Sequence, residues 1–346
     1  MVWTKFLRWL FLTATGALGA VLLLVAAVDP YGNLGTGWHR DRVMLDVNQR
    51  FMYPQITRSH EFDAAIIGTS TSRLMPPAPF DAAFGARFAA LAMNSATAWE
   101  QYRIADLFLE ENPGARGLVI GLDVVWCDRD AQAGDTTKRG FPDWLYDDSR
   151  LDDFQYLLNM KAIEISGRYF GYLVGRETPR YGADGYGVFT PPEGEYDLER
   201  ARGHIWGAGP RTIVAADPPV LPDAAERAGW QFPALAWIEE LFGRLPADAA
   251  RVLAFVPVHV AKQPRPASRD AAVEAECKAR VADIARRTGA VLVDYRFASP
   301  LTGTDENFWD PLHVRLPIAE RLARDIAAMA TGGPAAADAR ILYRPN

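Results

Sequence analysis

The chain has 346 residues, of which 49% are hydrophobic and 23% are charged, and its formal net charge is -6. This length and composition allow one large folded domain with a substantial core. The negative balance argues against a nucleic-acid partner, because nucleic-acid binding depends on clustered lysine and arginine side chains.

The N-terminus carries a targeting signal. Lys5 and Arg8 precede an uncharged apolar run at residues 9–28, and about 20 residues of helix span about 30 Å, the thickness of a bilayer core. A cleaved signal peptide is the competing interpretation, with a passable cleavage site at residues 25–27, but its apolar core is typically only about 7–15 residues long. We therefore favour a single-pass anchor in a bacterial inner (plasma) membrane, with everything after Asp29 in the periplasm or exterior.

Short apolar runs and amphipathic segments alternate along the rest of the chain. The apolar runs are typical of parallel strands covered on both faces, and they lie at residues 63–67, 87–93, 117–124, 251–258 and 290–295. Helices are expected at residues 98–111, 233–244, 269–288 and 317–330. The alternation predicts an α/β fold, a three-layer sandwich around a mostly parallel central sheet.

The same patterns divide the chain into segments. We expect a cytoplasmic stub and transmembrane anchor at 1–28, a juxtamembrane linker rich in turn residues at 29–61, the folded domain at 62–333 and a C-terminal tail at 334–346. An insertion at about 134–222 breaks the strand–helix rhythm. Long irregular insertions are usually functional or mobile, so it is either a lid that faces the substrate or a surface loop without a role.

The chain has two cysteines, Cys127 and Cys277, which share no metal-ligand spacing with its histidines. We expect neither a metal site nor a cofactor. A disulfide is possible in an exported domain, but both cysteines lie in apolar or helix-like surroundings where buried thiols are common, and the sequence favours free thiols.

A cluster of hydroxyl side chains follows the first predicted strand, in the sequence GTSTS at residues 68–72. Ligands of open α/β sheets bind just outside the carboxyl ends of the strands, and Gly68 permits a sharp turn there. A serine at this position is a poor nucleophile without an adjacent base. The hydroxyl cluster alone therefore does not distinguish a polar turn from a catalytic site.

His313 is the candidate base, because it lies three residues after Asp310 and just before the final predicted helix. Residues at i and i+3 face the same way on a helical turn, so Asp310 can orient one imidazole nitrogen while the other faces a serine. The alternative is that His313 caps the final helix and Asp310 only forms a turn.

Gly-x-Ser after the first strand together with Asp-x-x-His before the last helix resembles the SGNH (GDSL-like) hydrolase superfamily. The resemblance spans about residues 62–330 and implies that Ser70 is the nucleophile, with His313 and Asp310 completing a triad. Asn94 falls in the second block, which supplies an oxyanion donor in that family. Asp123 stands where the third block lies, and the usual Gly-x-Asn-Asp is absent, which leaves the backbone N–H of Ser70 and the Asn94 side chain as the expected donors.

The N-terminal anchor adds a narrower resemblance. A single membrane helix, a serine near position 70 and a terminal Asp-x-x-His are similar to the extracytoplasmic proteins that serve teichoic-acid D-alanylation or polysaccharide O-acetylation beside a membrane-bound O-acyltransferase. The composition, rich in Ala and Arg, favours an acetylated exopolysaccharide over teichoic acid.

Three further residues are candidates for substrate contact. Arg73 can steady a carboxylate or an oxyanion, although an arginine at a strand exit more often forms a surface ion pair. His259 follows the strand at 251–258 and is either a substrate contact or a structural histidine. Trp309, beside the Asp-x-x-His motif, is a candidate for stacking on a sugar ring.

We therefore expect a serine acyl esterase or acyltransferase that acts on a cell-envelope or secreted glycan. The alternative is a non-catalytic protein of the same fold that binds glycan or docks on a membrane-bound O-acyltransferase. Among the hydroxyls of residues 68–72, only Ser70 is expected to be chemically essential, and Ser72 is expected to cap the following helix.

Overall fold

The computed structural model describes residues 2–32, 34, 43–147 and 158–345. Its centre is a six-stranded sheet in the order β2-β1-β3-β4-β5-β6. Neighbouring strands are parallel except β5 and β6, which are antiparallel. The strands are β1 Ala64–Ile67, β2 Phe88–Ala90, β3 Gly117–Leu122, β4 Ala250–Phe255, β5 Val291–Asp294 and β6 Arg340–Tyr343.

The first five strands confirm the α/β prediction and match the predicted apolar runs. We did not predict β6, which lies within the stretch expected to be a tail. It is short and partly exposed, so its sequence lacks the continuous apolar character of the others. The order β2-β1-β3 places a topological switch point between β1 and β3, because the chain turns outward in opposite directions from these two strands. Such a switch point is where open α/β sheets bind ligands.

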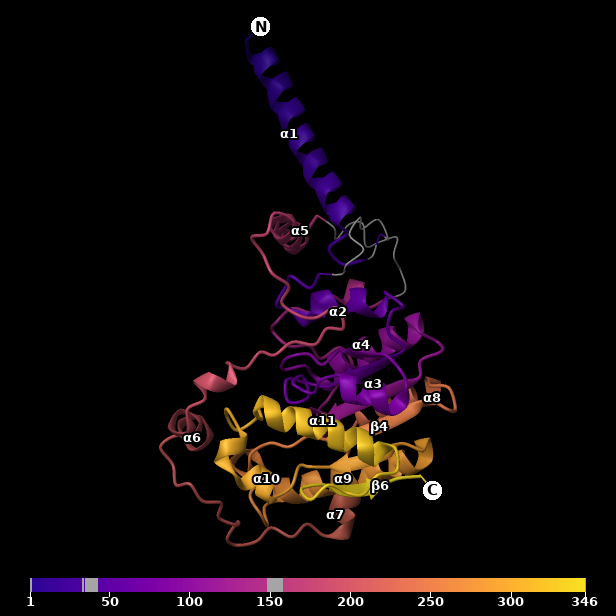
Figure 1. The fold of residues 1–346 in the computed structure, drawn as a ribbon, viewed down its shortest axis with the longest axis vertical. Coiled ribbons are helices and arrows are strands. Elements are labelled where there is room, and N and C mark those ends of the chain that lie inside the picture. The colour runs from indigo at the N-terminus through magenta and orange to yellow at the C-terminus, as the bar shows by residue number, and fades with distance from the viewer. Residues whose placement is uncertain (1, 33, 35–42, 148–157, 346) are drawn as a thin grey trace.

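Helices pack on both faces of the sheet (Figure 1). Successive strand residues point to opposite faces, so Ile67 joins the core cluster that holds α4, α8 and α9, and Ile66 joins the cluster that holds α3 and α11. These helices are α3 Ala78–Phe84, α4 Ala98–Glu111, α8 Leu235–Arg244, α9 Arg269–Thr288 and α11 Leu316–Ala330. The four predicted helices correspond to α4, α8, α9 and α11. Burial on both faces explains why β1 and β3 are apolar at every position.

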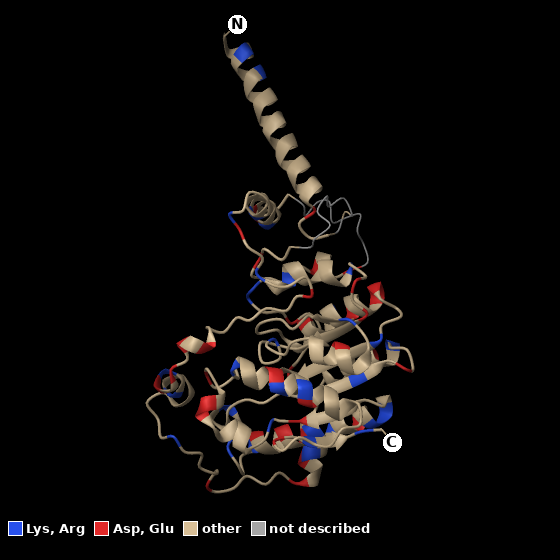
Figure 2. Cartoon of the chain, viewed as in Figure 1, with Lys and Arg blue, Asp and Glu red and all other residues tan. Residues whose placement is uncertain are grey.

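The N-terminal helix α1, Val2–Val28, projects from the domain (Figure 1) and carries charge only near its N-terminus (Figure 2). In the described part of the chain it is the one helix that is long and apolar enough to cross a membrane. Its last turn is anchored in the protein, since Val25 and Val28 are buried.

The expected juxtamembrane linker contains a buried helix, α2, at Gln49–Thr57. Asn48 caps its N-terminus, and Arg50, Met52 and Tyr53 are completely buried. Part of the expected linker therefore belongs to the hydrophobic core, where α2 packs against α4. The rest of the expected linker at residues 33 and 35–42 lies outside the described residues.

The predicted insertion contains two longer helices, α5 Met160–Leu173 and α6 Leu198–Trp206. It returns to the sheet, because the backbone N–H of Ala90 on β2 donates to the carbonyl of Asp184 over 2.7 Å. Residues 148–157 of the insertion lie outside the described residues. Elsewhere in the described part of the chain, the short helices are η1 Val124–Cys127, η2 Asp143–Leu145, η4 Glu193–Glu195, α7 Ala224–Ala228, η5 Val260–Lys262, α10 Pro300–Gly303 and η6 Asp305–Asn307.

Cys127 and Cys277 form a disulfide, so the expectation of free thiols is wrong. Cys127 ends η1, directly after β3, and Cys277 lies on α9. The packing of α9 against η1 brings their Cα atoms to 5.7 Å although 150 positions separate them in sequence. Apolar surroundings are compatible with either state, and only this tertiary contact decides between them.

Candidate active site

Ser70 lies in a turn that begins where β1 ends. The backbone N–H of Ser72 donates to the carbonyl of Thr69 over 3.1 Å, and the N–H of Met75 donates to Ser72 over 3.1 Å. Ser72 is buried, and a Cβ at either Gly68 or Gly121 would collide with its side chain. Gly68 is therefore needed here for the space it leaves.

The Ser72 side chain does not cap the following helix, contrary to our expectation. Helix α3 begins at Ala78 after Pro77, and no side chain caps it. The Ser72 hydroxyl has no hydrogen-bond partner in the part of the chain that the structure describes. Ser70, in contrast, is only partly buried.

A chain of hydrogen bonds links Ser70, His313 and Asp310. Nε2 of His313 lies 2.9 Å from Oγ of Ser70, and Nδ1 of His313 lies 2.7 Å from Oδ2 of Asp310. The sequence-based prediction that these three side chains meet is confirmed. The imidazole is thus held between an acceptor and a hydroxyl, which is the arrangement a general base requires.

Asp310 and His313 meet in a tight turn that precedes the last helix. The backbone N–H groups of Leu312 and His313 donate to Oδ1 of Asp310 over 2.8 and 2.9 Å, which leaves Oδ2 for the imidazole. Helix α11 begins only at Leu316, with Arg315 at its N-cap. His313 therefore does not cap this helix. Asp310 has two roles, because one carboxylate oxygen forms the turn and the other orients the imidazole.

The pKa of Asp310 lies below its usual value. Burial alone would raise this pKa, but the hydrogen bond to His313, the attraction of the imidazole and the two backbone N–H donors together outweigh the burial. The carboxylate is therefore ionised over the physiological range and can stabilise an imidazolium.

Two arginines bind Asn94, one at its side chain and one at its backbone carbonyl. Nη1 of Arg73 donates to its side-chain Oδ1 over 2.9 Å, and the guanidinium of Arg50 donates to its backbone carbonyl over 3.2 Å. Because Oδ1 is occupied, the amide presents its Nδ2 donors elsewhere, and none of the described side chains or carbonyls accepts from them. The backbone N–H of Ser70 likewise donates a hydrogen bond to no atom of the described residues. These are the two donors we expected for an oxyanion.

A buried ion pair holds Arg50, the residue that binds the backbone carbonyl of Asn94. Arg50 on α2 and Glu100 on α4 are both fully buried, and their nearest atoms lie 2.5 Å apart. Glu100 also completes a capping box with Thr97 at the start of α4. The sequence pattern Thr-x-x-Glu could have identified this box, but no local signal pairs Glu100 with an arginine fifty residues earlier.

Asp123 follows β3 and holds the turn of the serine. Its Oδ2 accepts a very short hydrogen bond from Thr69, and its Oδ1 accepts from the backbone N–H of Val125 over 3.1 Å. Burial raises the pKa of Asp123, and these hydrogen bonds with the charge of Arg296 only partly offset the rise. Asp123 therefore contacts the serine turn through Thr69, and no local sequence pattern indicates this contact.

Part of the insertion packs over the site. The ring of Phe189 lies edge-on to the imidazole of His313, with centroids 5.2 Å apart, and also stacks 4.7 Å from the guanidinium of Arg73. Glu193 pairs with Arg315, just before α11, at 2.5 Å. The insertion thus contributes side chains next to His313, which agrees better with a segment that faces the site than with a surface loop without a role.

His259 and Trp309 lie beside the site as buried residues. His259 is 0% exposed, its Nδ1 accepts from the N–H of Ala261, and its Nε2 lies 3.1 Å from Asp305 without the alignment of a hydrogen bond. Burial lowers the pKa of His259, and the nearby Asp305 offsets this only in part. Trp309 is 7% exposed and faces Tyr196. In this structure neither presents a surface to a substrate.

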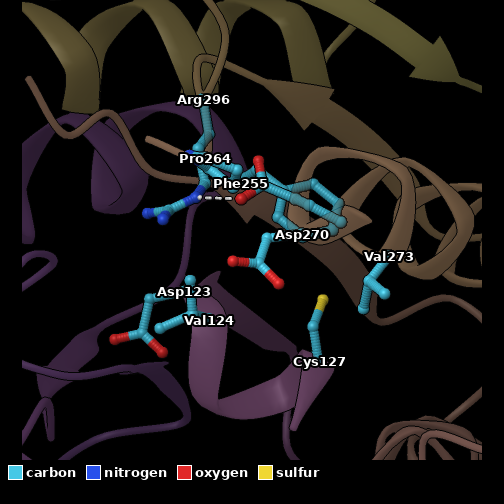
Figure 3. Close-up of a pocket in the computed structure, with 9 residues that line it drawn as sticks. Asp123, Val124, Cys127, Phe255, Pro264, Asp270, Val273 and Arg296 are labelled. Carbon is cyan, nitrogen blue, oxygen red and sulfur yellow. Dashed lines mark hydrogen bonds and ion pairs between the residues drawn. The ribbon is translucent and has the colours of Figure 1, made fainter. Parts of the chain in front are cut away.

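A cavity of about 160 Å³ opens next to the serine turn, at the carboxyl ends of β3, β4 and β5 (Figure 3). Asp123, Asp270 and Arg296 line it together with apolar side chains that include Phe255. No member of the Ser70–His313–Asp310 group lines this cavity, and Asp123 connects the two through Thr69. Within the described ranges, no group of three or more His, Cys, Asp or Glu side chains is placed to hold a metal ion.

Comparison with protein-family models found no match, and a search of curated proteins found none either.

Proposed function

We propose that this protein is a membrane-anchored, extracytoplasmic serine acyl esterase or O-acyltransferase of the SGNH type that acts on a cell-envelope or secreted glycan. The observation that carries the proposal is the continuous hydrogen-bonded path from Ser70 Oγ through His313 to Asp310, with links of 2.9 and 2.7 Å. Ser70 also follows β1, one of the two strands at the switch point of the sheet, and open α/β folds bind ligands there, which supports the proposal.

The residues imply a two-step acyl transfer. Ser70 Oγ attacks the carbonyl carbon of an ester while His313 Nε2 takes the hydroxyl proton, and the carbonyl oxygen becomes an oxyanion facing the N–H of Ser70 and Nδ2 of Asn94. His313 then gives the proton to the departing alcohol, which leaves Ser70 acylated. Water or a sugar hydroxyl attacks the acyl group in a second cycle, so that hydrolysis or transfer completes the reaction.

Two features support an extracytoplasmic location. The Cys127–Cys277 disulfide joins η1 and α9, and disulfides persist mainly in oxidising compartments such as the bacterial periplasm. Lys5 and Arg8 lie on the N-terminal side of the apolar run in α1, which the positive-inside rule orients toward the cytoplasm.

The choice of a glycan rests on the resemblance to proteins of polysaccharide O-acetylation, together with the openness of the site. The side chains of His313 and Asp310 keep 18% and 35% exposure, so a polymer hydroxyl has access without being engulfed. The acidic net charge favours an uncharged segment of such a glycan over a polyanion, because like charges repel. A membrane-bound O-acyltransferase is the proposed source of acyl groups.

Turnover by the full-length protein in detergent micelles or nanodiscs tests the proposal. Acetyl esters of p-nitrophenol and of oligosaccharides are supplied with and without unacetylated oligosaccharide, and mass spectrometry locates any acyl adduct after acid quenching. We expect an adduct on the peptide that contains Ser70 in the wild type and in Ser72→Ala, and none in Ser70→Ala. Binding of oligosaccharide without turnover or adduct would favour the non-catalytic partner instead.

A further inference from the structure

Helix α5 has one apolar face that the protein covers, and it exposes further large apolar side chains at its two ends. Ala162, Ile165 and Tyr169 on one face are buried in the protein. The exposed apolar side chains are Met160 at the start of the helix and Phe170, Leu173 and Val174 at its C-terminal end. Phe170 is 60% exposed and Met160 is 80% exposed. A cluster of this kind on a soluble surface marks an interaction site.

The charged side chains on helix α5 and just after it are mixed in sign, with a small basic excess. Lys161 and Arg168 accompany one acid on the helix, Glu164, and Arg176 beyond the C-terminal end of the helix is followed by Glu177. Glu164 is itself bound by Lys161 at 3.1 Å and by Arg168 at 3.0 Å, and these contacts lower its pKa although burial opposes them. The helix therefore carries one more basic than acidic side chain in a chain whose net charge is -6.

The position of α5 relative to α1 identifies what covers these exposed side chains. Tyr169 on α5 and Val28 at the end of α1 share one buried cluster. Lys161 binds Asp46 at 3.1 Å, which fastens α5 to the segment that follows α1. Figure 1 shows α1 running along the long axis of the molecule while α5 is seen end-on at its base, so α5 runs across the direction of α1.

We propose that α5 is an interfacial helix that inserts its exposed apolar side chains into the bilayer surface where α1 leaves the membrane. This inference rests on the proposed membrane anchoring by α1. About 20 apolar residues of helix fill a bilayer core, and counted from the N-terminal cations they end at Val28, the residue beside α5. A helix in the membrane plane with aromatic and aliphatic side chains below and Lys or Arg at its sides matches the interface and its anionic headgroups.

A second membrane contact limits rotation of the domain about α1. One transmembrane helix alone leaves a domain free to swivel, whereas α1 and α5 together fix which side of the domain faces the lipid. The α2 helix, whose Arg50 supports Asn94, packs into the same end of the domain as the α1 terminus. The bilayer contact therefore sets the height and orientation of the candidate active site relative to the membrane.

The test uses full-length protein reconstituted in vesicles of phosphatidylcholine with phosphatidylglycerol. Phe170→Cys is labelled under non-reducing conditions with an environment-sensitive nitrobenzoxadiazole dye, so the native disulfide stays closed. Leu221→Cys is the matched control, because Leu221 is 84% exposed and the segment between α6 and α7 that holds it lies at the opposite end of the molecule from α1 (Figure 1). Quenching is measured with aqueous iodide and with lipids spin-labelled near the headgroup end of the acyl chain.

We expect the dye at position 170 to show blue-shifted emission, several-fold protection from iodide and strong quenching by the spin-labelled lipid, while the dye at position 221 stays aqueous. Iodide access at position 170 equal to that at position 221 would overturn the proposal. Protection without quenching by lipid would assign position 170 to a protein contact and would also overturn it. If the protein failed to co-float with vesicles, the proposed membrane anchoring by α1 would itself be wrong. Acyl turnover tests the triad separately.

Discussion

Nη1 of Arg73 lies 2.9 Å from Oδ1 of Asn94, and this hydrogen bond fixes which way the Asn94 amide points. Arg73 is buried under Tyr181 and Phe189, with its guanidinium 5.0 and 4.7 Å from their ring centroids. The sequence predicts that Arg73 either steadies a carboxylate or an oxyanion or is a surface or ion-pairing residue, and its burial excludes a surface position. Its contacts hold the amide of Asn94, the oxyanion donor of the proposed mechanism.

Removing the Asn94 amide should lower turnover without a matching rise in KM. Asn94→Ala deletes a donor that acts mainly on the transition-state oxyanion, and loss of one such donor costs about a hundred- to a thousand-fold in kcat. Arg73→Lys should lower kcat less, because a lysine keeps the charge but lacks the fixed planar donors. Steady-state kinetics on a soluble acetyl ester measures both, and an unchanged kcat in Asn94→Ala would remove this residue from the site.

Asp310→Asn should retain the fold and lose most turnover. In serine proteases the equivalent change leaves geometry intact and lowers kcat about ten-thousand-fold, because the imidazole adopts the wrong tautomer. We expect a comparable loss here, measured by single-turnover acylation. A loss below tenfold would mean that Asp310 does not orient His313 during reaction.

The same variant tests the effect of pH on stability. The pKa of Asp310 is lower in the folded state than in the unfolded state, so its stabilising contribution is present above the unfolded pKa, about 3.9. That contribution is lost as the pH falls through the folded value. Thermal unfolding between pH 3 and 7 should therefore show a steeper acid loss for the wild type than for Asp310→Asn. Identical losses of stability with falling pH in the two proteins would contradict the lowered pKa of Asp310.

Ser72→Ala should leave stability unchanged or slightly increased. The Ser72 hydroxyl is buried without a hydrogen-bond partner among the described residues, and removing such a group relieves a desolvation cost of about 1–3 kcal/mol. Ser72→Val is the matched overpacking variant, because the added methyl groups would press on the backbone at Gly68 and Gly121. It should cost about 1–3 kcal/mol. Urea unfolding measures both, and a clear loss in Ser72→Ala would indicate a partner for its hydroxyl.

Opening the disulfide should destabilise the domain by about 2–4 kcal/mol. The bond closes a loop of 150 positions between η1 and α9, so it restricts the unfolded chain strongly. Paired Cys127→Ala and Cys277→Ala substitutions are compared with the wild type by denaturant unfolding, and reductant is added to each. Reductant should shift the wild type and leave the double variant unmoved, and equal midpoints without reductant would contradict the prediction.

The sequence identified elements whose signals are local. Apolar runs located β1 and β3, amphipathic periodicity located α4, α9 and α11, and two short motifs at opposite ends of the domain brought Ser70 and the Asp310–His313 pair together. Their meeting depends only on which edge of the sheet each reaches, and parallel strands end at the same edge.

Other features depend on tertiary packing that no local pattern records. The disulfide needs α9 to lie on η1, and the Thr69–Asp123 bond needs β1 and β3 to be neighbours. The burial of α2 was missed because Gln49, Arg50 and Gln55 are polar residues that become satisfied only inside the fold. His259 had the sequence position of a site residue, but the rings of Trp206 and Phe308 enclose it.

The central claim is that Ser70 is an activated nucleophile, and covalent labelling with a fluorophosphonate probe tests it most directly. The serine oxygen displaces fluoride from phosphorus only when a base such as His313 takes its proton, so labelling reports the assembled site without a known substrate. We predict one label per chain on the peptide that contains Ser70, undiminished in Ser72→Ala and absent in Ser70→Ala, whose turnover should fall by up to about a million-fold. A folded wild-type protein that takes no label, or a Ser70→Ala variant that is labelled like the wild type, would contradict the account.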